Sequence, residues 1–103
     1  MSRGVVLVRA ADPGLQLQAL RTALSLSLGD RPADLLVAGE AMAALTPPPN
    51  SEAAHCLQTL RQMALGIELD GDVAPSLVHP LAEVLPHDDF IDRLAAADFV
   101  QVF

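Results

Sequence analysis

The sequence is poor in cysteine, in aromatic residues and in basic side chains. It contains a single cysteine, Cys56, three phenylalanines, and no tryptophan or tyrosine. One cysteine excludes an intrachain disulfide and any zinc site built from several cysteines. Six Lys and Arg residues against thirteen Asp and Glu residues give a net charge of −7 and a pI near 4.5. Because an acidic surface repels phosphate backbones, direct binding of nucleic acid is not expected.

Long apolar runs are absent as well. None approaches the ~18–20 residues that span a bilayer, and the N-terminus lacks the apolar core of a signal peptide. We therefore expect a cytoplasmic protein with no membrane partner. The 103 residues predict one domain, residues 1–103, that buries roughly 65% of its unfolded surface. Since 51% of the residues are hydrophobic, we expect another subunit to cover part of the apolar surface.

The chain is organised around the apolar segment Gly4–Arg9. Three of its four consecutive apolar residues are β-branched, which predicts a strand buried on both faces. Asp12 follows where a helix N-cap belongs, and Pro13 where the first helical residue belongs. Strand, turn and helix start within thirteen residues predict the opening of a βαβ crossover.

The remaining segments alternate between the two kinds of element. The first two expected helices are Pro13–Leu28 and a short Glu40–Leu45. A third is capped by Asn50 or Ser51 and reaches Ala64. A fourth is capped by His87 or Asp88, and its apolar face consists of Phe90, Ile91, Leu94 and Ala95. Expected strands are Ala33–Ala38, Gly66–Asp70, Ala82–Leu85 and Asp98–Phe103. This order predicts a three-layer, doubly wound α/β fold, with a mostly parallel five-stranded sheet and helices on both faces.

Ligands of open α/β sheets bind outside the carboxyl ends of the strands. The segments expected there are Ala10–Asp12, Gly39–Glu40, Asp70–Pro75 and Pro86–His87. Among these residues, Asp12, Gly39 and Asp72 are candidates for a small-ligand pocket. Asp12 could also receive a metal or phosphoryl group, as in a receiver domain, but the lysine that such a domain needs after its last strand is missing; helix capping is the favoured role. No glycine-rich phosphate loop follows the first strand, so no nucleotide cofactor is expected.

Cys56 is the one candidate nucleophile. It lies five or six residues into its helix, at the edge of an apolar stripe, so packing is favoured over catalysis. Its neighbour His55 points about 100° away around the helix, so it cannot act as the general base for the thiol. His87, Asp88 and Asp89 could bind a metal, but acids at a helix start usually complement the helix dipole. We expect no bound metal.

Several segments, taken in order, resemble the DsrE/DsrF/DsrH family of sulfur-relay proteins, which includes TusB, TusC and TusD. The segments are Val5–Val8, Ala19–Leu26, Ala33–Ala41, Met63–Asp70 and Phe90–Val100. The resemblance covers almost the whole chain. It implies a small cytoplasmic subunit of a homo- or hetero-oligomer, a trimer or hexamer, whose protein partners pass persulfide sulfur.

The resemblance also implies where a sulfur-accepting cysteine would be. Members of the DsrE and TusD type keep it in the loop after the third strand, which here is Asp70–Ser76 and contains no cysteine. The chain is therefore more similar to the DsrF or TusC type. We expect a non-carrier subunit, structural or docking, without independent catalysis. The alternatives are a persulfide carrier or sulfurtransferase that uses Cys56, and a small-ligand-binding module at the strand ends.

Overall fold

The structure is a computed structural model that describes residues 4–29, 31–63, 65–70 and 82–103. Its centre is a five-stranded sheet in the order β4-β3-β2-β1-β5, and every strand pair is parallel. The strands are β1 (Gly4–Val8), β2 (Ala33–Val37), β3 (Ile67–Asp70), β4 (Glu83–Leu85) and β5 (Phe99–Val102). Each strand predicted from the sequence is present, within one residue at either end.

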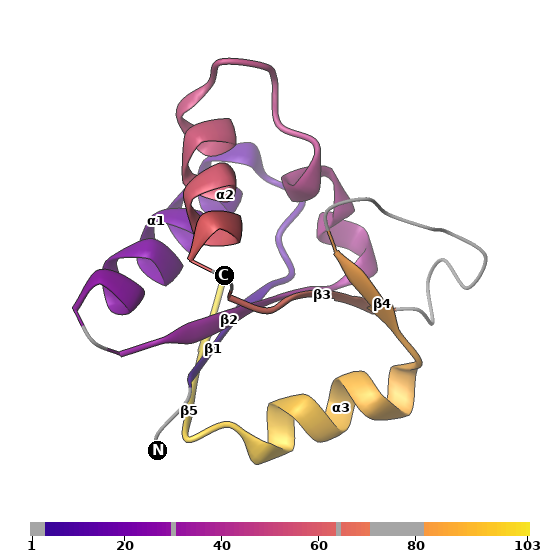
Figure 1. Ribbon diagram of the computed structural model, residues 1–103. Helices are drawn as coiled ribbons and strands as arrows, with labels where there is room; N and C mark the ends of the chain where they lie inside the picture. The colour runs from indigo at the N-terminus through magenta and orange to yellow at the C-terminus, as the bar shows by residue number, and fades with distance from the viewer. Residues whose placement is uncertain (1–3, 30, 64, 71–81) are drawn as a thin grey trace.

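The helices cover both faces of this sheet (Figure 1). On one face lie α1 (Pro13–Leu28), α2 (Glu52–Gln62) and the 3-10 helix η1 (Gly39–Leu45). On the other face α3 (His87–Ala96) crosses under the sheet and connects its two edge strands, β4 and β5. The predicted three-layer, doubly wound α/β class is confirmed. None of the helices that the structure describes is long and apolar enough to cross a membrane.

Side-chain caps fix the starts of α1 and α2. The Asp12 carboxylate accepts a hydrogen bond from the Leu15 backbone N–H at 3.0 Å, as its predicted capping role requires. Ser51 caps α2 through the Ala54 N–H at 3.2 Å. Asn50, the other candidate for that cap, instead has a φ of 63°, a left-handed conformation that asparagine tolerates well.

The two faces of the sheet differ in what they bury. The α1 and α2 face holds the larger apolar core, in which Val6, Val8, Leu35, Val37 and Leu69 of the strands meet Leu20, Leu57 and Leu60 of the helices. The α3 face holds a small cluster of Val5, Leu7, Leu36 and Phe90. Three acidic side chains, Asp34, Glu68 and Asp70, are buried as well. Burial of each large apolar side chain contributes roughly 1.5–3 kcal/mol, so most of the hydrophobic stabilisation comes from the first face.

Two predictions for α3 are wrong. Within its expected apolar face only Phe90 is buried, whereas Ile91 is 46% exposed and Ala95 is exposed too, because α3 packs on the sheet through a narrow stripe. The residue at the N-cap is Pro86 rather than His87 or Asp88, since the His87 side chain turns toward β3. Residues 71–76 of the loop after the third strand lie outside the described residues.

Candidate functional site

A cavity of about 380 Å³ lies at the carboxyl ends of β1, β2 and β3, where ligands of such sheets bind. Its polar side chains are Arg9, Glu40, Asp70 and His87, and Gly39 contributes backbone. Its apolar wall consists of Leu7, Phe90, Ile91 and Leu94. We call this cavity the strand-end pocket. Apolar walls with a few polar groups are typical of small-ligand sites.

An acid–imidazole pair stands inside the strand-end pocket. Asp70 is the last residue of β3 and is almost fully buried, while His87 is the first residue of α3 and is half-exposed. The His87 Nδ1 atom lies 3.0 and 3.1 Å from the two carboxylate oxygens of Asp70. Such a contact orients the imidazole ring.

The second charged pair of the pocket is much weaker. The Nε atom of Arg9 lies 3.6 Å from Oε1 of Glu40, and both side chains are about 60% exposed. Solvent screens exposed pairs, which contribute between zero and ~1 kcal/mol. Arg9 and Glu40 can therefore separate at low cost when a charged ligand approaches.

Of the two predicted strand-end residues that the structure describes, Gly39 lines this pocket and Asp12 does not. Gly39 begins η1 and lines the cavity. Asp12 lies at the start of α1, where its carboxylate is engaged by the Leu15 N–H, and it does not line the cavity. Asp72 lies outside the described residues. Asp70 and His87 both belong to the segments expected at this edge of the sheet, but no local pattern pairs them, because they are on separate elements.

Cys56 lies on the opposite face of the sheet from α3, inside the core that α1 and α2 form. Burial, and next the negative charge of Glu52, raise the pKa of the Cys56 thiol, while Arg21 works in the opposite direction. Arg21 and Glu52 form an exposed two-contact ion pair between α1 and α2. The thiol is thus held protonated, and a protonated thiol is a poor nucleophile.

A second, larger cavity of about 770 Å³ lies near the amino ends of β2 and β3, on the α3 face. Five carboxylates and one guanidinium line it: Asp34, Glu68, Glu83, Asp89, Asp92 and Arg93. We call it the acidic pocket. Among the described residues, no group of three or more His, Cys, Asp or Glu side chains could hold a metal ion.

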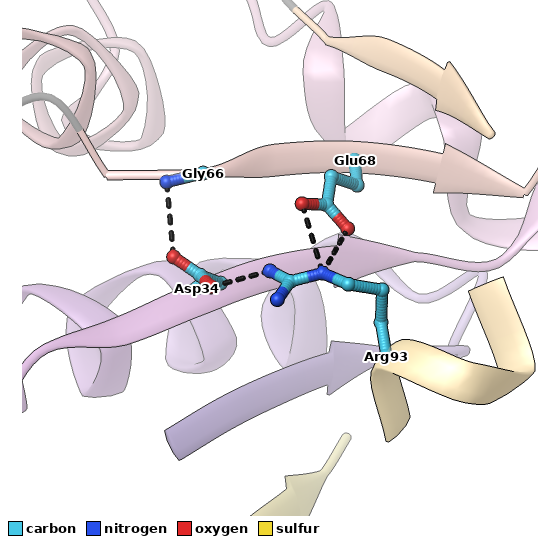
Figure 2. Close-up of polar contacts among 4 residues, drawn as sticks. All are labelled: Asp34, Gly66, Glu68 and Arg93. Atoms are coloured by element: carbon cyan, nitrogen blue, oxygen red, sulfur yellow. Dashed lines mark hydrogen bonds and ion pairs between the residues drawn. The ribbon is translucent and has the colours of Figure 1, made fainter. Parts of the chain in front are cut away.

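Arg93 of α3 lines the acidic pocket, and Figure 2 shows its guanidinium between Asp34 and Glu68. Its Nε donates to both oxygens of Glu68, at 3.1 and 2.9 Å, and its terminal nitrogen donates to Asp34 at 2.5 Å. The other oxygen of Asp34 accepts from the Gly66 N–H at 3.0 Å. The hydrogen bonds that Arg93 donates, first those to Glu68 and then the one to Asp34, raise the pKa of Arg93. Arg93 therefore joins α3 to two neighbouring strands.

Comparison with known proteins identifies the fold. No model of a known protein family matches the sequence, and no curated protein matches it either. Among solved structures, the crystal structure of the ychN protein from E. coli superposes with a TM-score of 0.80. The match covers 100% of both chains at 18% sequence identity, so the similarity lies in the fold. The chain therefore has the fold of the E. coli ychN protein over its entire length.

Proposed function

We propose that this chain is a non-carrier subunit, structural or docking, of a DsrE/DsrF-like sulfur-relay assembly. The order of its family-like segments supports this assignment. The fold it shares with the ychN protein agrees with the architecture that the resemblance implies. The protein would then bind carrier proteins that hold persulfide sulfur without accepting the sulfur itself.

One observation carries the proposal. In proteins of the DsrE type, the sulfur-accepting cysteine follows the third strand. Here the carboxyl end of β3 presents Asp70 bound to His87, and residues 71–76 contain no cysteine. A persulfide forms on a thiolate, and neither a carboxylate nor an imidazole can replace the sulfur. The only thiol, Cys56, is buried on the other face of the sheet with a raised pKa.

The first test asks whether the native protein can accept sulfur. The folded protein and a urea-unfolded sample are incubated with inorganic polysulfide, and both are then examined by intact-mass spectrometry. We expect the unfolded sample to gain sulfur on Cys56 and the folded protein to gain none. A stable sulfur adduct on Cys56 of the folded protein would instead favour the alternative of a persulfide carrier.

The second test asks whether the chain docks in a relay. A persulfide-loaded carrier of the DsrE or TusD type is mixed with the wild type and with Cys56→Ser, and complexes are measured by native mass spectrometry. Both proteins should bind equally, with the sulfur still on the carrier. No complex at micromolar concentrations would contradict the docking role.

The strand-end pocket supports a second candidate function, binding of a small ligand. Its polar groups, Arg9 and the Asp70–His87 pair, stand beside an apolar wall in a cavity of about 380 Å³. A thermal-shift screen with small anions and nucleotides tests this function. A ligand that raises the melting temperature of the wild type but not of His87→Ala would support it.

A further inference from the structure

The edge strand β5 leaves two valines exposed on the α3 face. β5 pairs with β1 in a register that places Val100 beside Val5 and Val102 beside Leu7. Val5 and Leu7 are buried against α3. Val100 and Val102 share that face but lie beyond the reach of α3, and they are 40% and 59% exposed.

The same two residues also present their backbone polar groups at the open edge. The Phe103 N–H donates to the Leu7 carbonyl at 2.9 Å, and the Phe103 carbonyl accepts from the Arg9 N–H at 2.7 Å. In a parallel pair, alternate residues direct both groups toward the same neighbour. Residue 101 therefore also faces β1, and the N–H and C=O groups of Val100 and Val102 point away from it, where no strand of the described residues pairs with β5.

Soluble proteins usually protect such an edge with charged side chains, proline, a bulge or a covering segment. The segment Phe99–Phe103 contains no charged side chain, no proline and no glycine. It is therefore a ready template for another strand, and its apolar residues favour one that brings apolar side chains of its own.

We propose that a second copy of this chain adds its β5 antiparallel to this edge, around a two-fold axis at Gln101. Val100 and Val102, whose backbone groups face outward, lie one position on either side of Gln101. The axis therefore places Val100 opposite the partner's Val102 and Val102 opposite the partner's Val100. This register forms four backbone hydrogen bonds and joins the two sheets into one. The edge of β5 is therefore complementary to itself, and a closed two-fold interface requires such a self-complementary surface.

The side chains fit the same arrangement. Directly opposite residues of an antiparallel pair lie on the same face, so the four valines meet on the α3 face and bury one another. On the other face the two Gln101 carboxamides stand opposite each other, where amide groups can exchange hydrogen bonds. No charged side chain of residues 99–103 is brought near its copy, although the chain carries a net charge of −7. The interface does not depend on the proposed relay function.

The assembly is tested through its mass, measured by light scattering on a sizing column over a range of concentrations. Val100→Lys, which buries a charge at the pairing edge, should halve the mass of the wild-type particle. Leu28→Lys is the matched control, because Leu28 is 69% exposed at the end of α1, away from β5. Val102→Pro removes one outward N–H while sparing the bonds to β1, and it should also halve the mass. A monomeric wild type, or both β5 variants with wild-type mass, would overturn the proposal.

A second experiment tests the register. The two-fold axis makes the two Gln101 residues a non-hydrogen-bonded pair, whose Cα separation of about 4.5 Å permits a disulfide. In a Cys56→Ser background, Gln101→Cys should oxidise to a covalent dimer, and Leu28→Cys should remain monomeric on a non-reducing gel. Equal cross-linking of both variants, or none at position 101, would rule out this register.

Discussion

Replacement of Arg93 by methionine tests how α3 is held to the sheet. Methionine keeps most of the length and apolar character of the arginine stem, so the substitution mainly removes the guanidinium. Asp34, whose side chain is 1% exposed, and Glu68 both lose their contact with this guanidinium. We expect a large loss of folding stability.

The size of the loss follows from burial. Removal of one partner of a buried ion pair costs roughly 3–5 kcal/mol, because the remaining charge is left uncompensated. Arg93 is 36% exposed and lines an open pocket, so water reaches the site and the lower end of that range applies. A loss of about 3 kcal/mol corresponds to a fall in melting temperature of roughly 12–24 °C for a domain of this size.

The assay is urea unfolding followed by far-UV circular dichroism, since the protein has no tryptophan or tyrosine to report by fluorescence. Arg21→Met is the matched control. Arg21 also makes two contacts to one carboxylate, Glu52, but both side chains are more than half exposed, so solvent screens the pair and the loss of stability should be much smaller than in Arg93→Met. Equal losses in Arg93→Met and Arg21→Met would refute the argument from burial.

A second substitution separates charge from packing. Asp34→Asn added to Arg93→Met removes one of the two carboxylate charges that Arg93 contacts, while the Asn oxygen can still accept from the Gly66 N–H. The double variant should recover about 1–2 kcal/mol of the stability lost by Arg93→Met alone. No recovery would mean that the loss comes from packing of the arginine stem.

Three further predictions concern single residues. The rate of Cys56 alkylation in the folded protein should rise with pH to a midpoint above 9.0, the ordinary pKa of the thiol, because burial raises the pKa of Cys56. A rate profile with its midpoint below 9.0 would contradict this. Gly4→Ala should cost about 1–2 kcal/mol in urea unfolding, since the new Cβ would overlap ring atoms of Phe99 and force the ring away; an unchanged midpoint would show that the ring moves freely. Gly66→Ala brings a Cβ within 3.0 Å of an Asp34 oxygen and should cost about 1 kcal/mol, whereas a stabilised protein would show that the carboxylate adapts.

The architecture could be predicted because its signals are local. The run Val5–Val8 followed by Asp12 and Pro13 specifies a buried strand and a capped helix start within a few residues of chain. The segment Leu24–Leu28 alternates as a strand would, yet it forms the end of α1, where the Ser25 carbonyl accepts from the Gly29 N–H. Good helix formers before it, and the need for a crossover between parallel strands, were sufficient to predict this correctly.

The polar contacts of the α3 face could not be predicted, because their partners are far apart in the sequence. Asp34 and Arg93 are separated by 59 positions, and no local pattern pairs them. A partial signal was present in Ile67–Asp70, where apolar and acidic residues alternate. In a strand this places Glu68 and Asp70 on one face, but the pattern does not say which basic side chains cover them.

In the structure, α3 contacts these two acidic residues of β3 through basic side chains near both ends of the helix. Its first residue, His87, meets Asp70 at the carboxyl end of β3, and Arg93 meets Glu68 nearer the amino end. Two strand residues span about 6.6 Å and six helical residues about 9 Å, so a helix crossing β3 obliquely can make both contacts at once. Between them, Phe90 fills the small apolar cluster. Two polar anchors and one apolar contact fix the position of α3 on the sheet, and with it the position of His87 in the strand-end pocket. The electrostatic contacts that stabilise the fold on this face are therefore the same ones that shape its candidate site.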